Sequence, residues 1–104
     1  MEVNSRFGQR IKQLREEKSL LQRQVAVKLD IDTPMLSKLE RGERKAKREQ
    51  VLKLAELFKV NSDELLTLWL ADKLYEIIKD EDLATNALRV AESEVRYSKR
   101  TKAQ

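Results

Sequence analysis

The stretch from residue 20 to residue 42 most constrains the fold, because two short amphipathic helices follow each other there with almost no connection. Their expected inward faces consist of Leu20, Val25, Ala26, Leu29, Leu36 and Leu39. This spacing predicts one short helix ending near Leu29 and a second over residues 33–41. Only Asp30, Ile31 and Asp32 separate the two.

Two helices joined by so few residues must cross steeply, which is helix-turn-helix geometry. Ile31 is expected to fill the corner, and Asp32 to cap the second helix by accepting from its free N–H groups. Pro34 falls in the first turn of that helix, where a missing N–H breaks no bond. Gly42 is placed to end the helix in a left-handed conformation.

The residues Gln22, Ala26, Ile31 and Ser37, with the run from Leu39 to Gly42, resemble the DNA-binding domain of lambdoid phage repressors and the Xre family of bacterial regulators. The resemblance covers residues 5–68. It implies an all-α protein with a five-helix, lambda-repressor-like domain that binds double-stranded DNA.

The sequence departs from this family at Asp30, where glycine is usual in the left-handed turn. Aspartate is one of the few other residues that tolerate this conformation, so we expect the turn to be kept.

The resemblance makes residues 33–41 the recognition helix, lying in the DNA major groove. The side opposite Leu36 and Leu39 would then face the bases. The expected base-reading residues are Thr33, Pro34, Met35, Ser37 and Lys38. Lysine reaches guanine acceptors and hydroxyl groups donate or accept, whereas proline offers only shape and methyl contacts. A phosphate contact is an equal alternative for Lys38.

Positive charge accompanies this motif: residues 1–60 hold 15 Lys and Arg against 9 Asp and Glu, whereas residues 61–104 hold 7 against 9. Cations also crowd residues 43–48, ahead of an expected helix, where they are unfavourable unless an anion is near. We expect DNA-phosphate contacts from Arg41, Arg44, Lys45, Lys47 and Arg48. The resemblance adds Gln22 with Arg23 and implies that they also brace the recognition helix. The alternative is a solvated cationic loop.

The first helix is expected from a cap at Asn4 or Ser5 to about Lys18, with Phe7, Ile11 and Leu14 forming its apolar stripe. Within this helix, the resemblance predicts that Arg15 forms an ion pair with Glu40 of the recognition helix. Such a pair would fix geometry more than it would add net stability. The alternative is two unpaired surface charges.

The C-terminal third is richer in apolar residues than one packed face requires. Residues 49–58 predict a helix whose buried side is Val51, Leu52, Leu54, Ala55 and Phe58, and Asn61 caps the next helix. Ten of the fourteen residues from 65 to 78 are apolar, which indicates burial on more than one side. A last helix follows residues 79–82.

We therefore expect a DNA-binding domain over residues 1–68, a helical hairpin for dimerisation over residues 69–97, and a basic flexible tail over residues 98–104. The expected dimer interface consists of Trp69, Leu70, Leu74, Ile78, Leu88, Ala91 and Val95. Packing within one chain is the alternative. A symmetric dimer would suit a palindromic DNA site.

Composition excludes several other classes. The chain has no cysteine and no histidine, which removes disulfides, thiol chemistry and the favoured zinc ligands, and no catalytic motif is visible. We expect no enzyme activity, cofactor, metal or small-molecule effector. No signal peptide or membrane-spanning run is recognised, so a cytoplasmic protein is expected. The resemblance to the Xre and phage repressor family implies a bacterial or phage origin.

The predicted function is sequence-specific binding of a palindromic operator by a homodimeric transcriptional regulator, as a repressor or an autoregulator. Two alternatives remain open. One is a protein-interaction module, such as an antitoxin or controller-type protein acting through its C-terminal helices. The other is RNA binding, which is disfavoured because the aromatic residues fall mostly on apolar stripes.

Overall fold

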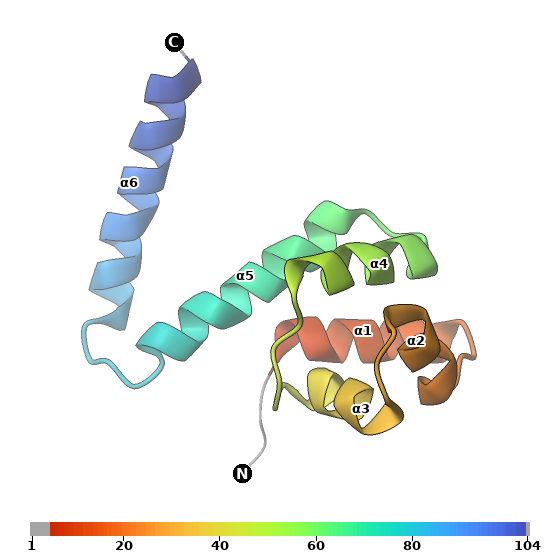
Figure 1. The fold of residues 1–104 in the computed structure, drawn as a ribbon. Coiled ribbons are helices and arrows are strands. Elements are labelled where there is room, and N and C mark those ends of the chain that lie inside the picture. Colours follow the sequence, from red (N-terminus) through yellow and green to blue (C-terminus); the bar gives the residue numbers. More distant parts are fainter. Residues whose placement is uncertain (1–4, 104) are drawn as a thin grey trace. The chain divides into compact units, whose positions relative to one another are not determined.

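The computed structural model describes residues 5–103, and in that range it contains six α-helices and no strand (Figure 1). The helices are α1 (Arg6–Glu17), α2 (Gln22–Leu29), α3 (Thr33–Arg41), α4 (Arg48–Phe58), α5 (Ser62–Ile78) and α6 (Ala84–Ala103). The prediction of an all-α protein is confirmed. The chain divides after Lys73 into two compact units, which are described separately. A cap at Asn4 lies outside the described residues.

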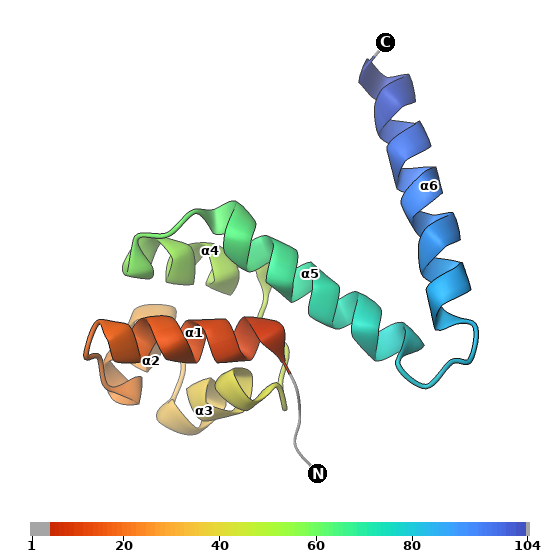
Figure 2. The ribbon, with the colours of Figure 1, turned by 180° about the vertical axis from the view of Figure 1, so that it is seen from behind.

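The first unit is built around one apolar core to which α1 to α5 all contribute. In both ribbon views α1 lies between α3 and α4, and α2 also packs on α3 and α4 (Figure 2). The largest fully buried side chains are Phe58, Ile11, Leu36, Leu39, Leu54, Leu65, Val25 and Val51. The expected stripes of the first three helices therefore meet. Leu52 is an exception, because it lies on the outer side of α4 and is 43% exposed.

Local capping follows the sequence closely. The Ser5 hydroxyl accepts from the Gly8 N–H at 2.8 Å, and Asp32 Oδ1 accepts from the Met35 N–H at 2.8 Å. Asp30 has φ 58° and Gly42 has φ 80°, so both adopt the expected left-handed conformation. Asp30 and Asp32 lie between α2 and α3, so these two residues shape the turn that joins the helices.

Gly8 lets α1 approach the C-terminal end of α3 very closely. A Cβ atom added at Gly8 would lie 2.7 Å from the Leu39 carbonyl oxygen and nearer still to that of Glu40. Because both neighbours are backbone atoms, they cannot move aside as a flexible side chain would. This requirement for glycine was not predicted, since it depends on a contact between distant residues.

Helix α5 runs without a break across residues 68 and 69, and its first part belongs to the first unit. Trp69 is only 7% exposed, and its Nε1 donates to the Ala46 carbonyl oxygen at 2.8 Å. A buried indole N–H needs such a partner. Trp69 is thus a core residue of the first unit, which corrects its assignment to the dimer interface.

Asp72 joins the same helix to the start of α1. Its Oδ1 accepts from the Arg6 N–H at 3.0 Å, and its Oδ2 accepts from the Ser5 hydroxyl at 2.7 Å and the Phe7 N–H at 3.1 Å. The carboxylate thereby satisfies N–H groups that a helix start leaves without intrahelical partners.

The second unit contains the end of α5 and all of α6, and none of its side chains from residue 74 to residue 99 is buried. Helix α6 continues through Ala103, so residues 98–103 are helical where a flexible tail was expected. Lysine, arginine and alanine are good helix formers, which is consistent with this continuation. The last tail residue, Gln104, lies outside the described residues.

Candidate nucleic-acid interface

Helix α3 has one buried and one accessible side. Leu36, Leu39 and Glu40 are buried, whereas Pro34 and Lys38 are exposed. The other expected base-reading residues, Thr33, Met35 and Ser37, are half-buried. All five positions therefore keep some accessible surface, and their polar groups lie outside the core.

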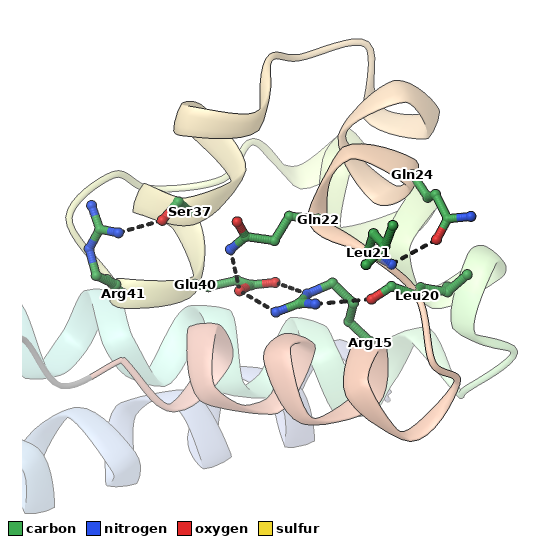
Figure 3. A network of polar contacts seen from close by, with 8 residues as sticks. All are labelled: Arg15, Leu20, Leu21, Gln22, Gln24, Ser37, Glu40 and Arg41. Atoms are coloured by element: carbon green, nitrogen blue, oxygen red, sulfur yellow. Dashed lines mark hydrogen bonds and ion pairs between the residues drawn. The ribbon is translucent and has the colours of Figure 1, made fainter.

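The inner side of α3 is held by a buried ion pair. Arg15 Nε lies 2.7 Å from Glu40 Oε2, and Arg15 Nη2 donates to Glu40 Oε1 at 3.2 Å (Figure 3). The pair expected from the resemblance is present, and the two side chains are only 12% and 4% exposed. Hydrogen bonding to Glu40 raises the pKa of Arg15 above its ordinary value. The pair joins α1 to α3.

Two further groups complete this network. Arg15 Nη1 donates to the Leu20 carbonyl oxygen at 3.0 Å, and Gln22 Nε2 donates to Glu40 Oε1 at 3.0 Å (Figure 3). Gln22 was expected both to brace the recognition helix and to contact phosphate. Its side-chain amide contacts Glu40 of α3, which is the bracing contact. No buried side-chain nitrogen or oxygen in residues 5–99 lacks a hydrogen-bond partner. The orientation of α3 is therefore supported from α1, α2 and the loop between them.

A second polar cluster lies at the exposed end of α3. Arg41 Nε donates to Glu43 Oε2 at 2.6 Å, its Nη2 donates to Glu43 Oε1 at 3.2 Å, and its Nη1 donates to the Ser37 hydroxyl oxygen. Hydrogen bonding between Arg41 and Glu43 raises the pKa of Arg41 and lowers that of Glu43. Arg41 was expected at a phosphate, but its guanidinium group is engaged by two protein partners.

Sequence reasoning missed the role of Glu43 in this cluster. The left-handed conformation of Gly42 turns the chain at the end of α3, and Glu43 comes directly after it. The sequence signal for this contact is that Glu43 stands two positions after Arg41, with the turn-forming Gly42 between them.

The remaining expected phosphate-binding cations are all exposed: Arg23, Arg44, Lys45, Lys47 and Arg48. Arg48 lies over the Trp69 ring at 5.2 Å from its centroid, and Lys73 lies over the same ring at 3.5 Å. In the part of the chain that the structure describes, none of these five cations forms a salt bridge. Their charge is therefore available to an anion, with Arg48 partly held by the indole.

The comparisons with known proteins agree with this geometry. A protein-family model described as helix-turn-helix matches residues 11–65, which is more than half of the chain. The chain belongs to the helix-turn-helix family of DNA-binding transcriptional regulators. The resemblance to Xre-type regulators noted from the sequence is confirmed.

Two solved structures resemble this helix-turn-helix protein. The restriction-modification controller protein C.AhdI from Aeromonas hydrophila is 34% identical with a TM-score of 0.54, and the match covers 59% of this chain and 88% of C.AhdI. The clp gene regulator ClgR from C. glutamicum has a TM-score of 0.55 over 64% of this chain and 87% of ClgR; at 19% identity it supports the fold alone. No curated protein matches this helix-turn-helix chain.

The expected dimer surface of this helix-turn-helix protein is accessible apart from Trp69. Leu70, Leu74, Leu88, Ala91 and Val95 are exposed, and Ile78 is half-buried. No helix in the described range has the length and hydropathy to cross a membrane. No group of acidic residues within that range is arranged to hold a metal ion.

Proposed function

We propose that this chain binds a palindromic DNA operator as a homodimer, with α3 in the major groove, and acts as a repressor or autoregulator. The accessible side of α3 carries the proposal, because Thr33, Pro34, Met35, Ser37 and Lys38 lie opposite a buried, hydrogen-bonded support. Side chains of these types distinguish bases by hydrogen bonds and methyl contacts in the major groove. A rigid inner side supports this role, since readout requires a fixed helix orientation.

DNA phosphates are the proposed partners of the exposed cations that precede and follow α3. Arg44, Lys45 and Lys47 lie on the loop between α3 and α4, and Arg23 lies in the first turn of α2. The first N–H groups of α4 add donors that have no intrahelical partner. Such contacts would set the register of α3 on the duplex without reading its sequence.

Self-association is proposed through the exposed apolar residues that follow the first unit. Leu74, Leu88 and Val95 are 51%, 41% and 55% exposed. Apolar side chains at helical spacing that face solvent in one chain favour burial against another copy. A two-fold symmetric dimer would place two α3 helices about one DNA turn apart, which suits a palindrome.

A role in gene control is supported by the 34% identity to C.AhdI, which is described as a restriction-modification controller protein. The first experiment is fluorescence anisotropy with DNA from upstream of the chain's own gene and with a scrambled duplex, each at two salt concentrations. A preference for the upstream DNA of about a thousandfold, which survives moderate salt, is expected for a specific regulator. Equal and salt-sensitive binding to both duplexes would contradict autoregulation.

The role of Lys38 is decided by Lys38→Ala, with Lys53→Ala on the exposed side of α4 as the control. A base-reading Lys38 predicts a relaxed preference at one base pair. A phosphate-contacting Lys38 predicts that Lys38→Ala weakens binding equally for all DNA sequences. It also predicts a salt slope, the change of log affinity with log salt concentration, that is smaller in magnitude by about one. The control should change neither quantity.

The same exposed apolar residues favour a second candidate, in which the C-terminal helices bind another protein, as an antitoxin or controller-type protein would. Light scattering at micromolar concentration separates the candidates. The dimer proposal expects twice the 12.2 kDa mass of one chain. A monomer that binds DNA without sequence preference would instead support the interaction module.

A further inference from the structure

The cluster of Ser37, Arg41 and Glu43 joins a proposed base-reading residue to an acidic residue outside the recognition helix. Ser37 and Arg41 lie one turn apart on α3, and Figure 3 shows the guanidinium group of Arg41 directed at the Ser37 hydroxyl. Glu43 binds the other side of that guanidinium through both carboxylate oxygens. Such a bidentate pair restricts the orientation of the arginine.

The direction of these hydrogen bonds determines what Ser37 offers to DNA. Arginine only donates hydrogen bonds, so the Ser37 oxygen is the acceptor in its contact with Arg41. The hydroxyl hydrogen then points away from the guanidinium and remains available as a donor, while one of the two acceptor lone pairs is used. Without Arg41 in place, the hydroxyl could rotate and either donate or accept.

We propose that Glu43 is a specificity-determining residue: by holding Arg41 on Ser37, it makes the Ser37 hydroxyl a hydrogen-bond donor to a base edge. This inference rests on the proposed function, in which the accessible side of α3 faces the major groove. Guanine, adenine and thymine each present an acceptor there, whereas cytosine presents its N4 amino donor. Because Arg41 already uses one of the two acceptor lone pairs of the Ser37 hydroxyl, Ser37 favours a base acceptor over the cytosine amino group.

The pairing of Arg41 with Glu43 also weakens the sequence-independent binding of the protein to DNA. Arg41 and Glu43 have side chains that are 53% and 41% exposed, so Arg41 lies where a phosphate could otherwise attract it. The Glu43 carboxylate neutralises this charge and keeps the guanidinium on Ser37. Removal of the carboxylate frees one more cation for the phosphate backbone, which strengthens binding without regard to sequence.

The test compares Glu43→Gln with Glu56→Gln, which makes the same charge change at an exposed residue in the last turn of α4, away from the helix start that is proposed to bind phosphate. Glu56 forms no salt bridge in the described part of the chain. Both full-length variants are titrated onto the scrambled duplex over a range of salt. Glu43→Gln is expected to bind it more tightly with a salt slope larger by about one, and Glu56→Gln to keep the original slope.

Base preference is measured with a panel of upstream duplexes in which each base pair is replaced in turn. At one position, the penalty for cytosine should fall by about fivefold or more in Glu43→Gln, the discrimination expected from one base contact. Ser37→Ala should lose the same preference, and the double variant Ser37→Ala/Glu43→Gln should lose no more. Additive losses, or losses at different positions, would overturn the proposal.

The salt slope on the scrambled duplex also separates this inference from the proposed function. If the unaltered chain shows no preference for the upstream duplex, the proposed autoregulation fails, but the slope still reports whether Glu43 restrains Arg41. Identical slopes for Glu43→Gln and Glu56→Gln overturn the inference in either case. Thermal melting of both variants should match that of the unaltered chain, because both residues are exposed.

Discussion

In residues 5–73, apolar side chains at helical spacing meet in a closed core, whereas in residues 74–99 similar spacing leaves them exposed. Leu36, Leu54 and Leu65 have no exposed surface in the first unit. In the second unit, Leu74, Tyr75 and Ile77 are 51%, 55% and 73% exposed. Apolar periodicity therefore defines a potential interface, and burial depends on whether the same chain supplies a partner.

The polar contacts of the two units differ in the same way. Buried or anchoring contacts of the first unit join residues far apart in sequence, such as Glu40 with Arg15 and Asp72 with Ser5. The ion pairs of the second unit, Glu76 with Lys79 and Glu92 with Arg96, are local and exposed. The first unit thus holds its own tertiary structure, whereas the ion pairs of the second unit join residues within one helical turn or at a helix end.

Truncation of one leucine in each unit should give the largest contrast. Leu54→Ala leaves a cavity in the core, and we expect the free energy of unfolding to fall by about 2–5 kcal/mol. Leu88→Ala removes an exposed side chain, so unfolding at low protein concentration should change by less than about 0.5 kcal/mol. Denaturant titration measures both. Equal losses would show that α6 packs within its own chain.

The next largest difference in stability is expected between the buried ion pair of the first unit and an exposed ion pair of the second. Glu40→Leu removes two hydrogen-bond acceptors from Arg15, and we expect a loss of about 1–3 kcal/mol of stability. Arg15→Met combined with Glu40→Leu should cost less than the sum of the single changes, because each alone strands its partner. Arg96→Met in the exposed pair of α6 is the control and should leave thermal melting unchanged. Additive effects of the two core changes would contradict an energetic coupling.

Removal of the contacts by which Asp72 joins α5 to α1 should have a smaller effect on stability. Asp72→Ala removes the carboxylate that caps α1, and we expect a loss of about 0.5–2 kcal/mol, the usual range for an N-cap. Asp80→Ala changes an exposed aspartate beyond the end of α5 and serves as the control. Thermal melting measures both variants. Identical melting curves would show that residues up to 73 are held without this contact.

The smallest expected effect concerns the exposed pair of Arg41 and Glu43, which resembles the second unit more than the core. The hydrogen bond from Arg41 lowers the pKa of Glu43 from its ordinary value of 4.5. Any stability from this pair is therefore present above pH 4.5 and lost as the pH falls through the lowered pKa. Titration of the Glu43 carboxyl group by NMR measures the shift, and Arg41→Gln should abolish it. An unshifted Glu43 would contradict the pairing.

Much of the first unit could be predicted from the sequence because its signals are local. Asp32 caps α3, Asp30 and Gly42 adopt left-handed conformations, and α3 has the predicted bounds of Thr33 and Arg41. Caps and turns depend on side chains within a few residues of the backbone that they satisfy. The pairing of Arg15 with Glu40 spans more of the chain and was predicted from the family resemblance alone.

The remaining features depend on which distant residues meet. Trp69 was predicted at a dimer surface because residues 65–78 are apolar on several sides, and only the contact with Ala46 assigns its indole to the core. The closeness of Gly8 to the Leu39 carbonyl oxygen has no signal in the neighbouring sequence. The sequence by itself determined the helices of the first unit, the caps and turns around α3, and the accessible side of α3, because periodicity and capping act over one or two turns. Only the tertiary structure decided which apolar side chains are buried and which charges are paired, because burial requires a partner surface that the local sequence does not specify.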